Sequence, residues 1–293
     1  MSLYAVAAII TGCFWGTTGL FARLLSDAGF TSLQLLFVRC LVAAFFFGVM
    51  ILIKNPKLFC IKLKDLPLFL AVGIAGQFLF SFFYYTAIGM MSISTACILL
   101  YLSPALVAIL SRFIFKDKMG KRGVLAVILC VLGCACVSGF GGTVTALGVV
   151  FALGAAISFA LINIIDRAIL SRGYTGLTVN FYIALIAALT AAIFVGVKQP
   201  MTLMFATGKT ALISILNGLV TGFLPFLCFS YALSGCESGK VSILASTEPV
   251  MAALLSIVVF REPFGIWSVV GIILVLGSIV LMNTKSKEER LKA

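Results

Sequence analysis

One acid stands out among the residues of this sequence that could do chemistry. Glu248 lies deep in an apolar stretch, in the segment Ser246-Thr247-Glu248-Pro249. A charge in hydrocarbon costs about 2.5–3.5 kcal/mol on insertion scales, so its presence at this depth calls for a reason. Two interpretations fit. Glu248 binds substrate or a proton, or it is a structural carboxyl group that hydrogen-bonds to hydroxyls and to backbone loosened by Pro249.

Other charges also lie in apolar stretches. Lys240 precedes Glu248 by about two helical turns, and a lysine that snorkels to the interface is the simpler interpretation. Arg39 lies about two turns into its own stretch, from which it either reaches outward or pairs with a carboxylate. Asp166-Arg167 closes a third stretch and is most simply an interfacial pair.

Several uncharged polar side chains lie too deep to be interfacial anchors. A polar group facing lipid is left unpaired, so we expect these side chains to face a central cavity and to bind substrate together with Glu248. They are Trp15, Gln77, Tyr101 and Asn163. Pro104 and Pro249 interrupt helical hydrogen bonding and are candidate gating positions.

The sequence contains no combination of residues that is typical of an enzyme active site. The chain has no histidine and no Cys-x-x-Cys pair, and we interpret its nine cysteines, including Cys134 and Cys136, as small apolar residues. No span combines paired carboxylates or a nucleophile with a base, and no phosphate-binding glycine-lysine motif occurs. We therefore expect no catalytic residue, no metal and no cofactor. A channel is a further alternative function, and it would need a continuous ring of groups lining a pore.

Composition limits the protein class. Of the 293 residues, 62% are apolar and 10% are charged. A soluble domain carries about 25% charged residues, so too few polar groups are available here to cover a soluble surface. The same apolar content excludes disorder. The chain is therefore expected to be a polytopic membrane protein whose partners are the lipid bilayer and a small-molecule substrate, with monomer and homodimer both open.

Ten stretches have the roughly 20 apolar residues that a helix needs to cross the bilayer. They are continuously apolar and lack the period-two alternation of barrel strands. The expected fold is all-α, with spans at about 3–25, 33–53, 66–90, 92–114, 123–140, 145–167, 178–198, 210–234, 238–260 and 265–283.

The chain also repeats itself. A shift of 145 residues places Phe78-Leu79 on Phe223-Leu224 and Pro104 on Pro249, with 11 identities over positions 78–120. The predicted units are residues 1–142 and 143–285, with five helices each, followed by a basic tail at 286–293. Because five is odd, the second half must be inverted relative to the first. Such inverted repeats build transporters with a central site between the halves.

The net charge of +12 agrees with this topology and does not point to nucleic acid. Cytoplasmic loops of membrane proteins collect Lys and Arg. With both termini in the cytoplasm, 16 basic residues lie inside and 4 outside. The outer ones are Arg23, Lys198, Lys209 and Arg261.

Taken together, the motifs resemble the drug/metabolite transporter superfamily, in its EamA-like branch. They are Phe14-Trp15-Gly16, Val38-Arg39, Leu102-Ser103-Pro104, Glu248-Pro249, Phe115-Lys116-Asp117 and Phe260-Arg261-Glu262. The resemblance implies secondary transport, usually export, through a central cavity. It also implies that Trp15, Tyr101, Pro104, Glu248 and Pro249 border that cavity.

Two functions follow from these expectations. The first is a secondary transporter in the cell (inner) membrane that exports a small amphipathic, amino-acid-like metabolite by alternating access. The alternative is a proton-coupled exporter of organic cations or drugs, in which Glu248 exchanges a proton for substrate.

Overall fold

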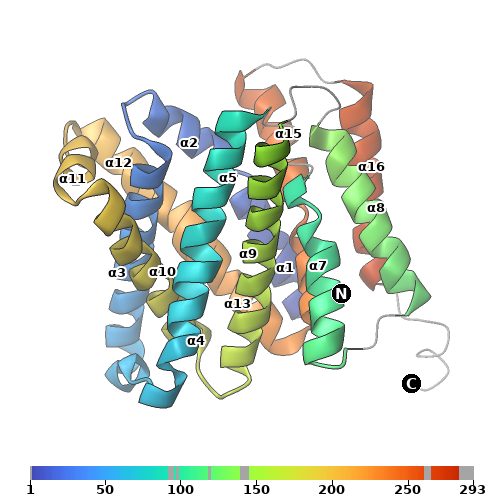
Figure 1. The fold of residues 1–293 in the computed structure, drawn as a ribbon, viewed down its shortest axis with the longest axis horizontal. Coiled ribbons are helices and arrows are strands. Elements are labelled where there is room, and N and C mark those ends of the chain that lie inside the picture. Colours follow the sequence, from blue (N-terminus) through green and yellow to red (C-terminus); the bar gives the residue numbers. More distant parts are fainter. Residues whose placement is uncertain are drawn as a thin grey trace.

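All regular structure in the described part of the chain is helical, as expected (Figure 1). A computed structural model describes residues 2–91, 96, 99–117, 120–138, 145–260 and 265–283. The predicted basic tail 286–293, Cys97 and the pair Arg261-Glu262 lie outside these residues.

The first half of the chain contains long helices with several interruptions. Its elements are α1 (Leu3–Trp15), α2 (Thr18–Ser26), α3 (Ser32–Lys54), the short 3₁₀ turns η1 (Pro56–Phe59) and η2 (Leu63–Asp65), α4 (Leu66–Ala71), the π-helical segment η3 (Val72–Phe78), α5 (Leu79–Met90), α7 (Ser103–Ile114) and α8 (Lys121–Ser138).

The second half follows a similar order. Its elements are α9 (Ala146–Leu170), α10 (Gly176–Val195), α11 (Lys198–Met204), α12 (Gly208–Asn217), the π-helical segment η4 (Gly218–Phe223), α13 (Leu224–Gly235), α14 (Ser238–Ala245), α15 (Glu248–Phe260) and α16 (Ile266–Asn283).

Hydroxyl side chains begin many of these helices. Thr31 accepts a hydrogen bond from the Gln34 backbone, and the Gln34 side chain accepts one from the Thr31 backbone, which completes a capping box. Thr145, Thr175 and Thr207 cap α9, α10 and α12 in the same position. Each cap satisfies a backbone donor that the helix itself leaves free.

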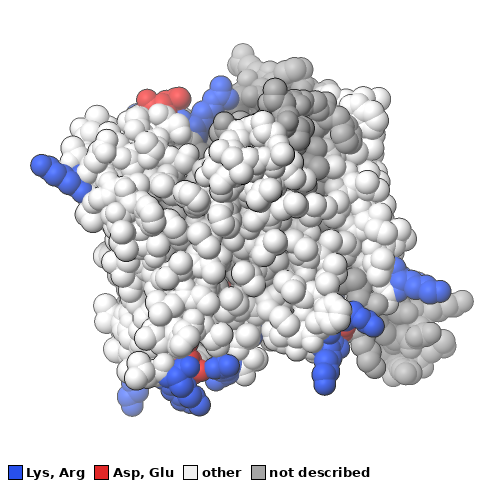
Figure 2. Space-filling model, viewed as in Figure 1, with Lys and Arg blue, Asp and Glu red and all other residues white. Residues whose placement is uncertain are grey.

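Six helical stretches in the described residues are long and apolar enough to cross a membrane. They are Leu3–Ser26, Ser32–Lys54, Leu63–Ala87, Ala146–Leu170, Gly176–Val195 and Gly208–Gly235, and Ser103–Ile114 and Val269–Leu281 are shorter apolar helices. The number of ten spans stays a prediction. Figure 2 shows a broad uncharged band, with Lys and Arg gathered mostly along the lower edge. Apolar side chains such as Phe113 and Ile193 are about 80% exposed, as expected of a surface that a bilayer covers.

Ion pairs and hydrogen bonds join the loops at the charged edge. Arg172 pairs with Asp65, and the Tyr174 hydroxyl donates to the same carboxylate at 2.7 Å. Tyr174 also accepts from the Lys62 backbone N–H at 3.0 Å. These contacts fix the α3–α4 connection against the turn between α9 and α10.

The most extensive helix contacts pair α8 with α16, α3 with α10, α5 with α9, and α1 with α13. In Figure 1, α8 and α16 lie together at one edge of the molecule, and α11 and α12 lie at the opposite edge. The helices between them surround the interior.

Glycines bring α1 against the interruption between α14 and α15. A Cβ atom on Gly12 would collide with Thr247 Oγ1 and the Ala245 carbonyl oxygen. One on Gly16 would lie 2.7 Å from the Glu248 carbonyl oxygen. At Gly19 on α2, an added Cβ atom would have nothing within 4 Å. The close approach of α1 therefore depends on Gly12 and Gly16 and not on Gly19.

We predict that Gly12→Ala destabilises the protein by about 1–3 kcal/mol, because the added methyl overpacks the α1–α14 contact. Gly19→Ala is the matched control, since it makes the same change on α2 in open space. Thermal unfolding in detergent measures both. Equal melting temperatures for the two variants would contradict this account of the α1 contact.

Candidate functional site

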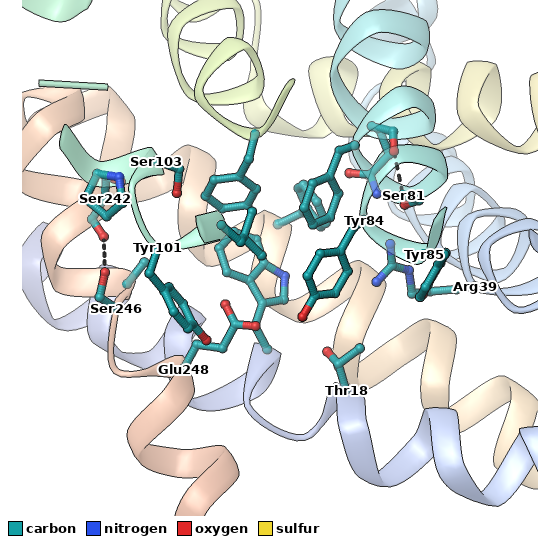
Figure 3. A pocket seen from close by; sticks show the side chains of 18 residues that line it. Thr18, Arg39, Ser81, Tyr84, Tyr85, Tyr101, Ser103, Ser242, Ser246 and Glu248 are labelled. Carbon is teal, nitrogen blue, oxygen red and sulfur yellow. Dashed lines mark hydrogen bonds between the residues drawn. The ribbon is translucent and has the colours of Figure 1, made fainter. Parts of the chain in front are cut away.

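Several helix interruptions meet inside the molecule. α1 ends at Trp15 and α2 begins at Thr18, while α14 ends at Ala245 and α15 begins at Glu248. α7 begins at Ser103, directly after a turn. Backbone that leaves the helical ladder at membrane depth is tolerated where protein or a cavity surrounds it. The side chains at these interruptions converge on one cavity (Figure 3).

This cavity has a volume of about 110 Å³ and is mostly aromatic and hydroxyl-bearing. Its lining residues are Trp15, Thr18, Arg39, Gln77, Phe80, Ser81, Tyr84, Tyr85, Leu100, Tyr101, Ser103, Pro104, Phe159, Phe226, Ser242, Ala245, Ser246 and Glu248. No described residue of α8 or α16 is among them. The structure thus brings together five residues singled out from the sequence, namely Trp15, Gln77, Tyr101, Pro104 and Glu248.

Two other predicted site residues, Asn163 and Pro249, are not among the residues that line the cavity. Asn163 is fully buried on α9, and its amide donates to the Phe159 carbonyl oxygen at 2.9 Å. Pro249 is the second residue of α15. The helix is interrupted just before Glu248, so the expected position of Glu248 at the centre of a continuous helix is wrong. At a helix start, proline lacks an N–H that would have no intrahelical partner. Pro104 holds the same position in α7.

Aromatic rings form one wall. Trp15 packs against Phe159, Phe226 and Phe229, with ring centroids 5.3 to 5.7 Å apart. Phe80 continues this wall, 5.4 Å from Phe159. These rings come from α1, α5, α9 and α13, so the wall joins both halves of the chain. Aromatic faces of this kind bind apolar and cationic groups.

Two opposite charges line the cavity. Figure 3 shows Glu248 and Arg39 on opposite sides of it, and Arg39 lies beside Tyr85. Neither side chain forms an ion pair within 4 Å with another residue that the structure describes. Of the two alternatives for Arg39, outward reach and pairing with a carboxylate, the structure thus shows neither.

The buried acid Asp166 lies near the charged edge, between α9, α10 and α13. Asp166 is fully buried and accepts a hydrogen bond from Ser230 Oγ at 3.0 Å. The Asn180 amide donates to Ser230 Oγ and to the Phe226 carbonyl oxygen, each at 2.9 Å. This chain connects Asp166 to the backbone of a residue that lines the cavity.

The expected Asp166-Arg167 pair does not form. Arg167 makes a two-point contact with Asp117, with Nη2 to Oδ1 at 3.0 Å, and lies over the Phe115 ring at 4.3 Å. Consecutive residues on a helix point in different directions. Asp166 therefore turns inward to α13 while Arg167 turns to the end of α7.

Small hydroxyls on the cavity were not singled out from the sequence. Ser81 donates to the Gln77 carbonyl oxygen at 3.2 Å, and Ser246 donates to the Ser242 carbonyl oxygen at 3.0 Å. Helical serines commonly bond back to their own backbone in this way. Their sequence signal is therefore weak, and only the position of the helix breaks could have found them.

Comparisons with known proteins agree on one group. The sequence profile of the EamA-like transporter family matches the chain twice, over residues 2–139 and 146–284. An uncharacterized transporter of Clostridium kluyveri is 23% identical over 297 residues, which cover 97% of this chain and 94% of that protein. The uncharacterized transporter YvbV of Bacillus subtilis is 26% identical, covering 84% of this chain and 81% of that protein.

A solved crystal structure shares the fold. It superposes with a TM-score of 0.79 over 96% of this chain and 98% of that one. The sequence identity is 17%, so this likeness concerns the fold alone.

We predict that Ser230→Ala destabilises the protein by about 1–3 kcal/mol, because the change removes a partner from both Asp166 and Asn180 in a buried site. Ser234→Ala, one turn later on α13, removes a hydroxyl that bonds the Tyr231 carbonyl oxygen on an exposed face. We expect that control to stay within about 0.5 kcal/mol of the parent. Thermal unfolding of purified protein distinguishes them, and a Ser230→Ala value as small as the control would show that the network adds no stability.

Proposed function

Because this chain belongs to the EamA-like transporter family, we propose that it is a secondary transporter that exports a small amphipathic, amino-acid-like metabolite by alternating access. The observation that carries this proposal is the aromatic and hydroxyl-lined cavity, with walls drawn from both halves of the chain. Ligand sites with mostly apolar walls and few polar groups are typical for small molecules. Trp15, Gln77, Tyr101 and Glu248 contact the substrate in this proposal, while Asn163 supports the wall through Phe159.

The proposed architecture has ten spans in two inverted five-helix units, residues 1–142 and 143–285. Three observations support it. The family profile matches each half once. The π-helical segments end at Phe78 and Phe223, 145 residues apart, and α7 and α15 begin at Ser103 and Glu248, also 145 apart.

The helix contacts supply the third observation. Exchanging the halves turns the α5–α9 contact into the α13–α1 contact, and turns the α7–α9 contact into the α15–α1 contact. The contacts of α3 with α10 and of α8 with α16 map onto themselves. Such exchange is expected of a pseudo-two-fold axis between repeats. Alternating access then arises when one unit rocks against the other, and the interruptions beside Pro104 and Pro249 absorb the motion.

The proposed location is the cell membrane, with both termini in the cytoplasm. The 16 basic residues against 4 on the two sides support this orientation. The uncharged band between two charged edges in Figure 2 agrees with it.

A proton-coupled exporter of organic cations is the second candidate. The position of Glu248 on the cavity wall favours it, since a carboxylate there could hold a proton or a cation in turn. The Arg39 guanidinium on the same cavity weakens it, because a cationic substrate would be repelled there.

The transport proposal predicts that Trp15→Ala lowers flux at least tenfold, because the ring is part of the cavity wall. A thermal-shift screen of metabolites in detergent first selects the substrate, and flux into proteoliposomes then measures transport. Trp267→Ala on α16 is the control, since that side chain is 56% exposed on the outer face. Equal flux in both variants would exclude this cavity as the route.

The topology proposal predicts that single cysteines at Lys64 and Lys121, in a Cys-less background, react only with reagent that reaches the cytoplasm. A cysteine at Lys198 reacts from outside. Impermeant maleimide on intact cells provides the measurement. External labelling at Lys64 or Lys121 would reverse the proposed orientation.

The two proposed functions predict different results for Glu248→Gln. This change keeps the shape and hydrogen bonding of the side chain but removes its ability to ionise. Under proton coupling, this variant loses accumulation driven by a pH gradient and keeps equilibrative exchange. Full gradient-driven transport in proteoliposomes would rule out Glu248 as the proton carrier. Glu248→Asp, which still ionises, is the matched comparison.

A further inference from the structure

We infer that the cavity selects dipolar ions and binds the cationic group of the substrate at Glu248 and its anionic group at Arg39. This inference rests on the proposed function, because it assigns the substrate class of the same cavity. It also gives Arg39 a role that its sequence context leaves open.

Two side chains of opposite charge line the same cavity from separate helices. Arg39 comes from α3 and Glu248 from the first turn of α15, and both line the same cavity. Two ion pairs between other described residues, Arg167–Asp117 and Arg172–Asp65, lie at the charged edge instead. Within the described part of the chain, the two charged side chains therefore line one cavity without forming an ion pair with each other.

Close helix packing fixes the chain at both charged residues. On the Arg39 side, η4 approaches so closely that a Cβ on Gly218 would lie 3.2 Å from the Arg39 carbonyl oxygen. One on Gly222 would lie 3.4 Å from Arg39 Cγ. The stem of Arg39 is thus packed against a neighbouring helix and cannot snorkel freely to the membrane surface.

Glu248 is held in the same manner from the other side. Gly16 of α1 lies against its carbonyl oxygen, and Thr247 Oγ1 donates to the Ile9 carbonyl oxygen at 2.9 Å. The chain at Arg39 and at Glu248 is thus fixed on separate helices that both border the cavity.

The free energy of burying charge determines which kind of molecule binds between the two side chains. A charge removed from water without a partner is strongly disfavoured, and a bound ion of opposite sign compensates it. A lone cation would compensate Glu248 and be repelled by Arg39, and a lone anion would do the reverse. A molecule that carries both charges compensates both, while the rings of Trp15 and Phe80 contact its apolar part.

The two charged ends of the cavity also have different neighbours. Figure 3 shows the Tyr101 hydroxyl close to Glu248 and the Tyr85 ring close to Arg39, with Tyr84 between the two ends. A dipolar ligand would therefore bind in one orientation. Small amino acids and their close analogues have this chemistry.

Binding to purified protein tests the inference apart from transport. Trp267→Phe leaves Trp15 as the single tryptophan, so its fluorescence reports on the cavity directly. The probes are two matched sets. The first is L-leucine, 3-methylbutylamine and 4-methylpentanoate. The second is L-alanine, ethylamine and propanoate. Within each set, the amine and the acid each lack one charged group.

We expect at least one amino acid to bind at least tenfold more tightly than its amine and its acid at neutral pH. Arg39→Gln should remove the preference over the amine, and Glu248→Gln should remove the preference over the acid. Lys240→Gln and Glu237→Gln remove charges of the same sign away from this cavity, and both should keep the order. Arg39→Lys and Glu248→Asp keep each charge and should retain the preference in part, which separates lost charge from misfolding.

The inference is overturned if neither amino acid binds, or if an amine or an acid binds as tightly as its amino acid. Counterflow of labelled L-leucine or L-alanine in proteoliposomes is measured separately. Ordered binding without any flux would refute transport and leave the dipolar site standing. Flux of a singly charged or neutral substrate, without ordered binding, would refute the dipolar site and leave transport standing.

Discussion

The need to pair every backbone N–H and C=O inside hydrocarbon governs this structure. Helices satisfy that need alone, but a binding site requires side chains and backbone to turn toward a common space. The chain meets both demands by interrupting helices only where other helices cover the break. The gap between α14 and α15 is the clearest case, because α1 closes over it through Gly12 and receives the Thr247 hydroxyl on the Ile9 carbonyl oxygen. The cavity is therefore a product of the same packing that makes the breaks tolerable.

Several buried polar side chains away from the cavity are also paired, and their partners are mostly other side chains. Asp166, Ser230 and Asn180 satisfy one another between three helices and end on the Phe226 carbonyl oxygen. Arg167, one residue further on, leaves the membrane interior and pairs at the edge with Asp117. Polar residues in this chain thus divide into interior networks that hold helices together and edge pairs that hold loops together. The cavity charges belong to neither group.

The sequence was informative where a residue type has few uses in a membrane. Trp15, Gln77, Tyr101 and Glu248 are poorly suited to face lipid, and the structure places all four on one cavity. The EamA-like assignment is confirmed by the family match, and the all-helical fold is confirmed for the described residues. The direction in which a side chain points was harder to predict. Hydrophobic periodicity is weak in spans that are apolar all round, so it did not indicate that Arg39 points inward or that Asp166 turns away from Arg167. Nor did it place the start of α15 at Glu248, because Pro249 fits a kink within a helix as well as a helix start.

The two π-helical segments bear on how a chain of this kind can change over evolution. A π turn holds one more residue than an α-helical turn in nearly the same place. A residue gained or lost within η3 or η4 would rotate one part of the span relative to the other by about 100°, while the ends stay near their loops. The face that a span presents to the interior can therefore be exchanged by a single insertion or deletion, with the membrane thickness still matched. Relatives would then differ in the side chains that face the interior through shifts in helix register as well as through substitutions.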